Sequence, residues 1–428
     1  MDLFNRYKVE RINYDTTYDA ELVVKNKERK RRLLRIQVEP IIEGKKFIRD
    51  KEFCLLEKIG KIVKDAVCPN FLYLHTTYTL QLKKVKANVN FQFLELVNAR
   101  VEGNLRIAEF EAPDENIVLT RDNAKAFTFG LLAAYHTLHF NNINHMSINT
   151  GNIIGVRKRT RPDEVGLKGS YYYVYGLTGF AVPKRDQSIV PIIKDFKNSN
   201  QDIDEYFEPN LEYIAPELIF ITGERPMYDE KTEVFLLGLF IFNSISTRNI
   251  FDKVENKDQY EKGAEEYLKH CTESNYNRVK DIFLCENQEL VFKHAWILTH
   301  ILGWLTNKDV PGVENTKIWQ ILNKYKSGDA KQRKFGGPFM RGVLGDGLYN
   351  LLRSMLKWNR DERPTFLELL KTAEYFNNYR ANTITDIQRQ KKNTHLILGT
   401  LVWLMEVLEQ QVVKIYKKKK SYNVISVK

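Results

Sequence analysis

The sequence predicts an α+β protein with two lobes, a small β-rich N-terminal lobe and a larger helical C-terminal lobe. Apolar and polar residues alternate with the two-residue period of strands at 18–25, 33–38 and 91–96. After about residue 120, apolar residues recur at helical spacing over longer segments. Of the 428 residues, 43% are hydrophobic, a balance that supports a large buried core.

One helix interrupts the strands of the predicted N-terminal lobe. It spans 47–67, and its apolar residues Phe53, Leu56, Ile59 and Val63 fall at helical spacing. The helix should end at the Cys-Pro-Asn turn of 68–70. Strands with one helix make a compact α+β lobe, which we assign to residues 1–98.

The predicted C-terminal lobe covers 99–380. It begins with a helix at 123–140 that is apolar on nearly all faces and should therefore be buried. Two short strands follow, at 152–156 and 171–175, separated by a polar loop. Further helices are expected at 231–245, 347–358 and 365–375, of which the first is apolar almost all round and suits the centre of the lobe.

Two segments extend this plan. Residues 250–340 look like an insertion with apolar helices of its own, at 292–305 and around Trp319. Residues 381–428 hold an apolar segment at 395–416 that is too short to span a bilayer. It is either a helix docked on the body of the protein or an interfacial or partner helix.

The charge and the cysteines indicate which partners and which compartment the protein could have. The formal net charge is +12, and basic residues concentrate at 27–35 and 414–420. These basic segments are either solvated surface or contacts to an anionic membrane surface or nucleic acid. The four cysteines are scattered without metal-binding or disulfide spacing. With no signal peptide and no transmembrane span, we expect an intracellular protein.

Several motifs in order resemble the protein-kinase family over about residues 7–378. The segment 145–152 reads His-Met-Ser-Ile-Asn-Thr-Gly-Asn, where the family has H-R-D-x-x-x-x-N. It is most similar to the H-x-D-x-H-x-G-N-I form of kinases encoded by large DNA viruses. In this alignment His145 and Asn152 match, while Ser147 replaces the catalytic aspartate. A serine cannot accept a substrate proton at neutral pH as a carboxylate does.

The resemblance also implies a degenerate metal-binding loop. The segment 173–181 reads YVYGLTGFA, so that Leu177, Thr178 and Gly179 stand where the family has D-F-G. Moving the register by one residue places Gly176 there, and neither alignment provides a carboxylate. We therefore expect no metal site. Three other aspartates fall in loops that the sequence does not place: Asp163, Asp186 and Asp195.

Three landmarks of the C-terminal lobe are similar to those of the family. They are Ala-Pro-Glu at 215–217, the segment from Glu233 to Gly238 for D-x-W-x-x-G, and Arg363 before a proline. The resemblance implies that Glu217 and Arg363 form a partly buried ion pair.

The phosphate-binding elements of the N-terminal lobe look altered. Residues 12–21 contain no glycine where the family has G-x-G-x-x-G. The strand that carries V-A-I-K in the family holds Arg35 or Gln37 at the lysine position, depending on register. Glu52 or Glu57 either fills the helix position that pairs with that lysine or is an exposed helix charge.

The resemblance implies a catalytically inactive pseudokinase, without ATP or Mg, that binds or scaffolds other proteins or forms part of a virion. An atypical active serine/threonine kinase that uses ATP and Mg is the alternative. An unrelated α+β protein with chance motif matches is a third interpretation.

Overall fold

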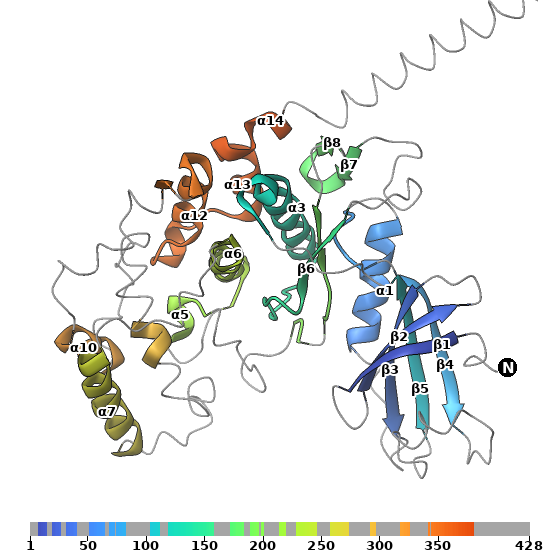
Figure 1. Ribbon diagram of the computed structural model, residues 1–428, viewed down its shortest axis with the longest axis horizontal. Helices are drawn as coiled ribbons and strands as arrows, with labels where there is room; N and C mark the ends of the chain where they lie inside the picture. Colours follow the sequence, from blue (N-terminus) through green and yellow to red (C-terminus); the bar gives the residue numbers. More distant parts are fainter. Residues whose placement is uncertain are drawn as a thin grey trace, which may run out of the picture.

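The computed structural model describes the two lobes and much of the helical insertion (Figure 1). The described residues are 7–14, 19–26, 31–40, 51–64, 68–72, 74–82, 103–111, 119–157, 172–183, 189–196, 198–200, 214–219, 228–245, 257–273, 292–296, 317–325, 341–342 and 344–380.

The N-terminal lobe is a five-stranded antiparallel sheet with the strand order β1-β2-β3-β5-β4. Its strands are β1 (Tyr7–Tyr14), β2 (Asp19–Asn26), β3 (Arg31–Pro40), β4 (Leu74–Leu82) and β5 (Gly103–Glu111). Helix α1 (Lys51–Lys64) lies on the side of the sheet that faces the helical lobe (Figure 1). Gly60 allows this close approach, since a Cβ there would lie 3.0 Å from the Cβ of Leu74.

The N-terminal sheet continues past the boundary predicted at residue 98. Strand β5 pairs with both β3 and β4 and so completes the N-terminal sheet, which extends to Glu111. The helix predicted at 47–67 is confirmed as α1 in its central part, and Leu56, Ile59 and Val63 are buried as expected. The strand predicted at 91–96 lies outside the described residues.

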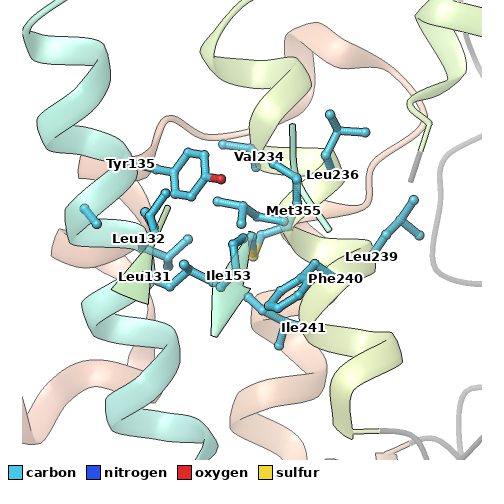
Figure 2. Packing of buried hydrophobic residues seen from close by; sticks show 14 of the residues in the cluster. Leu131, Leu132, Tyr135, Ile153, Val234, Leu236, Leu239, Phe240, Ile241 and Met355 are labelled. Carbon is cyan, nitrogen blue, oxygen red and sulfur yellow. The ribbon is translucent and has the colours of Figure 1, made fainter. Parts of the chain in front are cut away.

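The core of the C-terminal lobe is built by three helices that meet around α6 (Figure 2). They are α3 (Arg121–Phe140), α6 (Glu230–Ile245) and α12 (Asp346–Met355). Side chains of all three pack together, among them Leu131, Val234 and Met355. Every residue of α6 from Thr232 to Phe242 is buried, which confirms the prediction of a central helix.

The remaining elements of this lobe are short. Helix α5 is Pro216–Ile219, and the helices after α12 are η9 (Arg360–Glu362), α13 (Phe366–Thr372), η10 (Glu374–Phe376) and α14 (Asn377–Arg380). Helix α13 begins with a capping box in which Thr365 and Glu368 exchange hydrogen bonds. The helix predicted at 365–375 is therefore split, since α13 ends at Thr372 before a 3₁₀ turn.

Two separate two-stranded ladders lie on this lobe. Strand β6 (Ile153–Arg157) pairs with β9 (Ile189–Ile193), so that Ile153 faces Ile193. Strand β7 (Tyr172–Tyr175) pairs with β8 (Phe180–Pro183) across the 3₁₀ turn η3 (Gly176–Thr178). The sequence predicted β6 and β7, but it did not predict their partners.

The lobes meet where the segment after α1 reaches β9. The Asn70 side-chain nitrogen donates to the carbonyl of Pro191 at 2.8 Å, and the Asn70 backbone carbonyl accepts from the Ile193 amide at 2.8 Å. Phe71 forms a parallel bridge with Ile193. On α1, Lys58 Nζ donates to the carbonyl of Asn141 at 2.7 Å.

The insertion contains helices α7 (Lys257–Glu273) and α10 (Lys317–Lys324), at the end of the lobe far from the sheet (Figure 1). The Phe292 ring stacks on Tyr267 with centroids 5.3 Å apart, and Trp319 contacts Trp358. The segments 395–416 and 414–420 lie outside the described residues. Within the described part of the chain, none of the helices has both the length and the apolar character needed to cross a bilayer.

Candidate functional site

His145 anchors the start of the loop that follows α3. It is fully buried, its Nδ1 lies 3.1 Å from the Tyr135 hydroxyl and its Nε2 lies 3.2 Å from the carbonyl of Lys194. Because a carbonyl only accepts, Nε2 carries the proton and Nδ1 accepts from the hydroxyl. Desolvation by burial lowers the pKa of His145, which favours this neutral form.

The side chains of Ser147 and Asn152 are in direct contact. The Asn152 amide nitrogen donates to Ser147 Oγ at 2.7 Å and to the Ser147 carbonyl at 3.1 Å. The turn between them is closed by Asn149, whose side-chain oxygen accepts from the backbone amides of Gly151 at 2.7 Å and Asn152 at 2.9 Å. Ser147 is half-buried, and its hydroxyl has a neutral amide as partner.

Strand β9 brings an aspartate to the same place. The Lys194 amide donates to the carbonyl of Asn152 at 2.9 Å, which extends the β6–β9 ladder by one residue. Asp195 follows with a left-handed backbone (φ 62°). Next, the ring of Phe196 packs edge-on against His145 with centroids 5.0 Å apart, and it lies 6.2 Å from the ring of Phe71. Asp195 therefore directly follows the residue that pairs with Asn152 at the end of the ladder.

This placement corrects the assignment of the metal-binding loop. Leu177, Thr178 and Gly179 form the turn of the β7–β8 hairpin, where Thr178 Oγ1 donates to the Tyr175 carbonyl at 2.8 Å. The hairpin packs through Tyr175 and Phe180 on Phe129 of α3. The strand that pairs with β6 is β9, and the residues that follow it are Lys194-Asp195-Phe196. Residues 176–179 provide no carboxylate, as expected, but the segment that follows β9 does, in Asp195.

A signal for Asp195 was present in the sequence. Asp195-Phe196 comes after the buried apolar strand 189–193, and it precedes Ala215 by twenty residues. The pattern at 173–181 looked similar to a strand followed by D-F-G, but strand pairing decides which candidate joins Asn152. Pairing between strands distant in sequence is not encoded in a local pattern.

The candidate positions in the N-terminal lobe are placed by backbone register alone. Arg35 on β3 pairs with Glu21 and Ala108, and Gln37 pairs with Asp19 and Arg106. The side chains of Arg35, Gln37 and Glu52 lie outside what the structure describes, as does the β1–β2 turn. Glu57 is exposed and accepts from Thr77 Oγ1 at 3.3 Å, as a surface helix charge does.

The ion pair implied for Glu217 and Arg363 is formed. Arg363 Nη1 and Nη2 each donate to one oxygen of the Glu217 carboxylate, both at 2.7 Å. The guanidinium, which is buried, also donates to the carbonyls of Lys357 at 2.7 Å, Lys231 at 3.1 Å and Trp358 at 3.1 Å. A two-pronged pair with its remaining donors satisfied fixes three segments of the lobe relative to one another.

Glu233 joins α6 to the loop and is fully buried. Its carboxylate lies 2.7 Å from His139 Nε2 and accepts from the Met146 amide at 2.9 Å and the Tyr228 hydroxyl at 3.0 Å. Burial raises the pKa of Glu233, but the hydrogen bond and charge of His139 outweigh it and the pKa is lowered. The charged Glu233 thus holds Met146, whose backbone is left-handed (φ 58°). Farther along α6, Gly238 lies against Leu356.

Comparison with known proteins bears on this arrangement. Residues 186–376 match the family model of the protein kinase domain, a segment that includes β9, Asp195, Glu217, Glu233 and Arg363. The chain has a protein-kinase-like fold. Among solved structures it is similar to the MAP kinase LmaMPK10 from Leishmania major, with a TM-score of 0.47, 14% identity and coverage of 87% of this chain and 84% of that one. No curated protein matches the chain.

A kinase-like fold implies ATP and Mg. The residues that would hold the metal fit this expectation, and the residues that would hold the phosphates do not. In kinases the D-F-G aspartate and the catalytic-loop asparagine hold the metal ions. Asp195 and Asn152 provide oxygen ligands of the kind that Mg²⁺ prefers. The phosphate-binding elements do not fit, since 12–21 lacks glycine and 33–38 lacks lysine. Among the described residues, no group of three or more His, Cys, Asp or Glu side chains is placed to hold a metal.

Proposed function

We propose that this kinase-like protein is a pseudokinase, which does not transfer phosphate and acts by binding other proteins. The observation that carries this proposal is Ser147, which takes the position of the proton acceptor and is hydrogen-bonded to Asn152 at 2.7 Å. A serine hydroxyl remains protonated at neutral pH and cannot take up the proton of an acceptor hydroxyl. The glycine-free segment 12–21 and the absent lysine support the same conclusion.

An atypical serine/threonine kinase is the second candidate, and Asp195 favours it. The position of Asp195 after the partner of Asn152 supports a retained metal-binding pair, which would leave the proton acceptor and the phosphate-binding elements of the N-terminal lobe as the altered positions. A kinase of this kind would take a proton acceptor and phosphate ligands from other residues.

Phosphate transfer separates the two candidates. Purified full-length protein is incubated with labelled ATP and Mg²⁺, alone and with a generic serine/threonine substrate. The pseudokinase proposal predicts no more labelling by the wild type than by Asp195→Asn, which removes the metal-binding carboxylate. Labelling by the wild type that Asp195→Asn abolishes would overturn it and support the kinase.

Metal and nucleotide binding is tested separately. We expect Asp195 and Asn152 to give Mn²⁺ or Mg²⁺ a weak but measurable affinity, which Asp195→Asn should reduce at least tenfold. ATP added with the metal should raise the melting temperature no further than the metal alone, because the phosphate-binding elements are altered. A large further shift with ATP would contradict this expectation.

The binding role predicts that partners do not depend on the site. We expect Ser147→Ala and Asp195→Asn to recover the same proteins as the wild type in quantitative affinity purification from the cells that make this protein. Loss of all partners in Asp195→Asn, with the fold intact by circular dichroism, would link binding to the site around Asp195 and contradict a scaffold role.

A further inference from the structure

The segment after Asp195 is tied to the chain just ahead of His145. The side-chain oxygen of Asn200 accepts from the Asn144 amide at 2.7 Å, and its side-chain nitrogen donates to the Asn142 carbonyl at 2.9 Å. The backbone amide of Asn200 donates to the Asn144 carbonyl at 3.1 Å. One exposed asparagine thus makes three hydrogen bonds to the main chain of two residues, Asn142 and Asn144.

Ser199 adds a second attachment on the buried side. Ser199 is only 5% exposed, and its hydroxyl donates to the carbonyl of His145 at 3.1 Å. Its backbone amide donates to the carbonyl of Phe196 at 3.1 Å, which closes a turn directly after Asp195. The Phe196 ring is buried against His145 and Phe71. Asp195 therefore lies between a fixed strand and a fixed turn.

The chemistry of Asn200 suits this role in two ways. Only a side chain with both a donor and an acceptor makes these two bonds, because Asn144 offers an N–H and Asn142 a carbonyl. Asn200 also has a left-handed backbone (φ 53°), which asparagine tolerates better than most residues. Glycine at this position would keep the backbone shape and lose only the side-chain bonds.

The arginine that helps to order this segment in kinases is replaced in this chain. Activation loops of kinases are ordered when a phosphorylated residue pairs with arginine. Where the H-R-D motif has that arginine, this chain has Met146, which is buried and cannot pair with a phosphate. Residues 201–213 contain no serine or threonine, and beside two tyrosines, Tyr206 and Tyr213, they carry five acidic residues: Asp202, Asp204, Glu205, Glu208 and Glu212.

We propose that Asn200 and Ser199 form a latch that holds Asp195 beside Asn152 without phosphorylation. The latch rests on the hydrogen bonds to residues 142–145, and only its consequence for metal binding rests on the proposed function. Ser199 and Asn200 are positioning residues that act through the backbone of Asp195.

The test is amide hydrogen exchange of the full-length protein, read by mass spectrometry over peptides that contain 194–200. Asn200→Gly should speed exchange in this segment about tenfold, as loss of one to two hydrogen bonds predicts, and leave α6 unchanged. Asn142→Gly is the matched control. It changes an exposed asparagine with the same left-handed backbone (φ 54°) and leaves the carbonyl that Asn200 uses in place. Ser199→Ala should act like Asn200→Gly.

Phosphatase treatment of the wild type should leave exchange at 194–200 unchanged. The latch is refuted if phosphatase loosens this segment, or if Asn200→Gly and Ser199→Ala both exchange there like Asn142→Gly.

Mn²⁺ affinity gives a readout that a purely structural role would not move. Asn200→Gly should weaken Mn²⁺ binding several-fold at an unchanged melting temperature, whereas unchanged affinity in a variant with faster exchange would refute the positioning role. If the wild type binds no Mn²⁺, the metal proposal fails while the exchange measurement still decides the latch.

Discussion

The surroundings of Arg363 and of Ser147 differ in how they use charge and burial. Arg363 is buried, is paired twice with Glu217 and donates to three carbonyls. Ser147 is half-buried, and its hydroxyl contacts a neutral amide. The first arrangement stabilises the shape of the lobe, and the second leaves the position of the proton acceptor without a carboxylate. Under the proposed function, a kinase-like framework persists where the residue for proton transfer is absent.

Breaking the framework should have the largest effect. Arg363→Ala leaves the Glu217 carboxylate partly buried without its cation, and we expect it to lower the free energy of unfolding by about 3–5 kcal/mol. Chemical denaturation followed by circular dichroism measures this change. Arg353→Ala, on an exposed position of α12, is the control and should change stability by less than about 0.5 kcal/mol. A loss below about 1 kcal/mol for Arg363→Ala would show that the ion pair of Glu217 and Arg363 contributes little to the stability of the lobe.

Overpacking the contact between α6 and α12 should be the next largest effect. A Cβ on Gly238 would lie 2.9 Å from Leu356 Cδ2 and 3.2 Å from Met355 Cβ. Gly238→Ala should therefore cost about 1–3 kcal/mol, because buried side chains must shift. Gly342→Ala, which has open space around the added methyl, should cost less in the same denaturation experiment.

The pair of His139 and Glu233 predicts a pH dependence. Burial lowers the pKa of His139, but the hydrogen bond and charge of Glu233 raise it above 6.5 overall, so its contribution is complete below 6.5 and is lost as pH rises through the folded pKa. The pKa of Glu233 is lowered below 4.5, so its contribution is lost as pH falls through that lower value. The pair should stabilise most between about pH 4.5 and 6.5.

Unfolding measured across pH checks this window. The stability difference between the wild type and His139→Gln should shrink above pH 6.5. His136→Gln is the control with the opposite sign, since burial lowers the pKa of His136 and its neutral form is favoured in the folded protein. A difference for His139→Gln that is constant with pH would contradict the pairing of charges.

Changing the loop itself should have the smallest effect on stability. Ser147→Ala removes one neutral hydrogen bond at a half-buried position, while the Asn152 amide keeps the Ser147 carbonyl. We expect a loss within about 1 kcal/mol. A cost as large as that of Arg363→Ala would show that Ser147 belongs to the framework and would remove the contrast between the two regions.

Local patterns predicted helices α1, α3, α6 and α12 and four of the strands, β2, β3, β6 and β7, well. Helices α3 and α6 are apolar on nearly all faces. This pattern is visible in each helix's own residues and does not depend on knowing what the helix packs against. The pair of Glu217 and Arg363 was also foreseen, because each residue sits in a short motif. The lobe boundary and the place of Asp195 were missed, since both depend on which distant strands pair.

Strand β9 is hydrogen-bonded both to β6 of the C-terminal lobe and to Asn70 of the N-terminal lobe. Asn70 binds it on either side of Ile192, two residues before Lys194 leads into Asp195. A rotation of the N-terminal sheet would therefore be transmitted to β9 through the hydrogen bonds of Asn70. A partner that binds the N-terminal lobe alone would thereby act on Asp195 without contacting it.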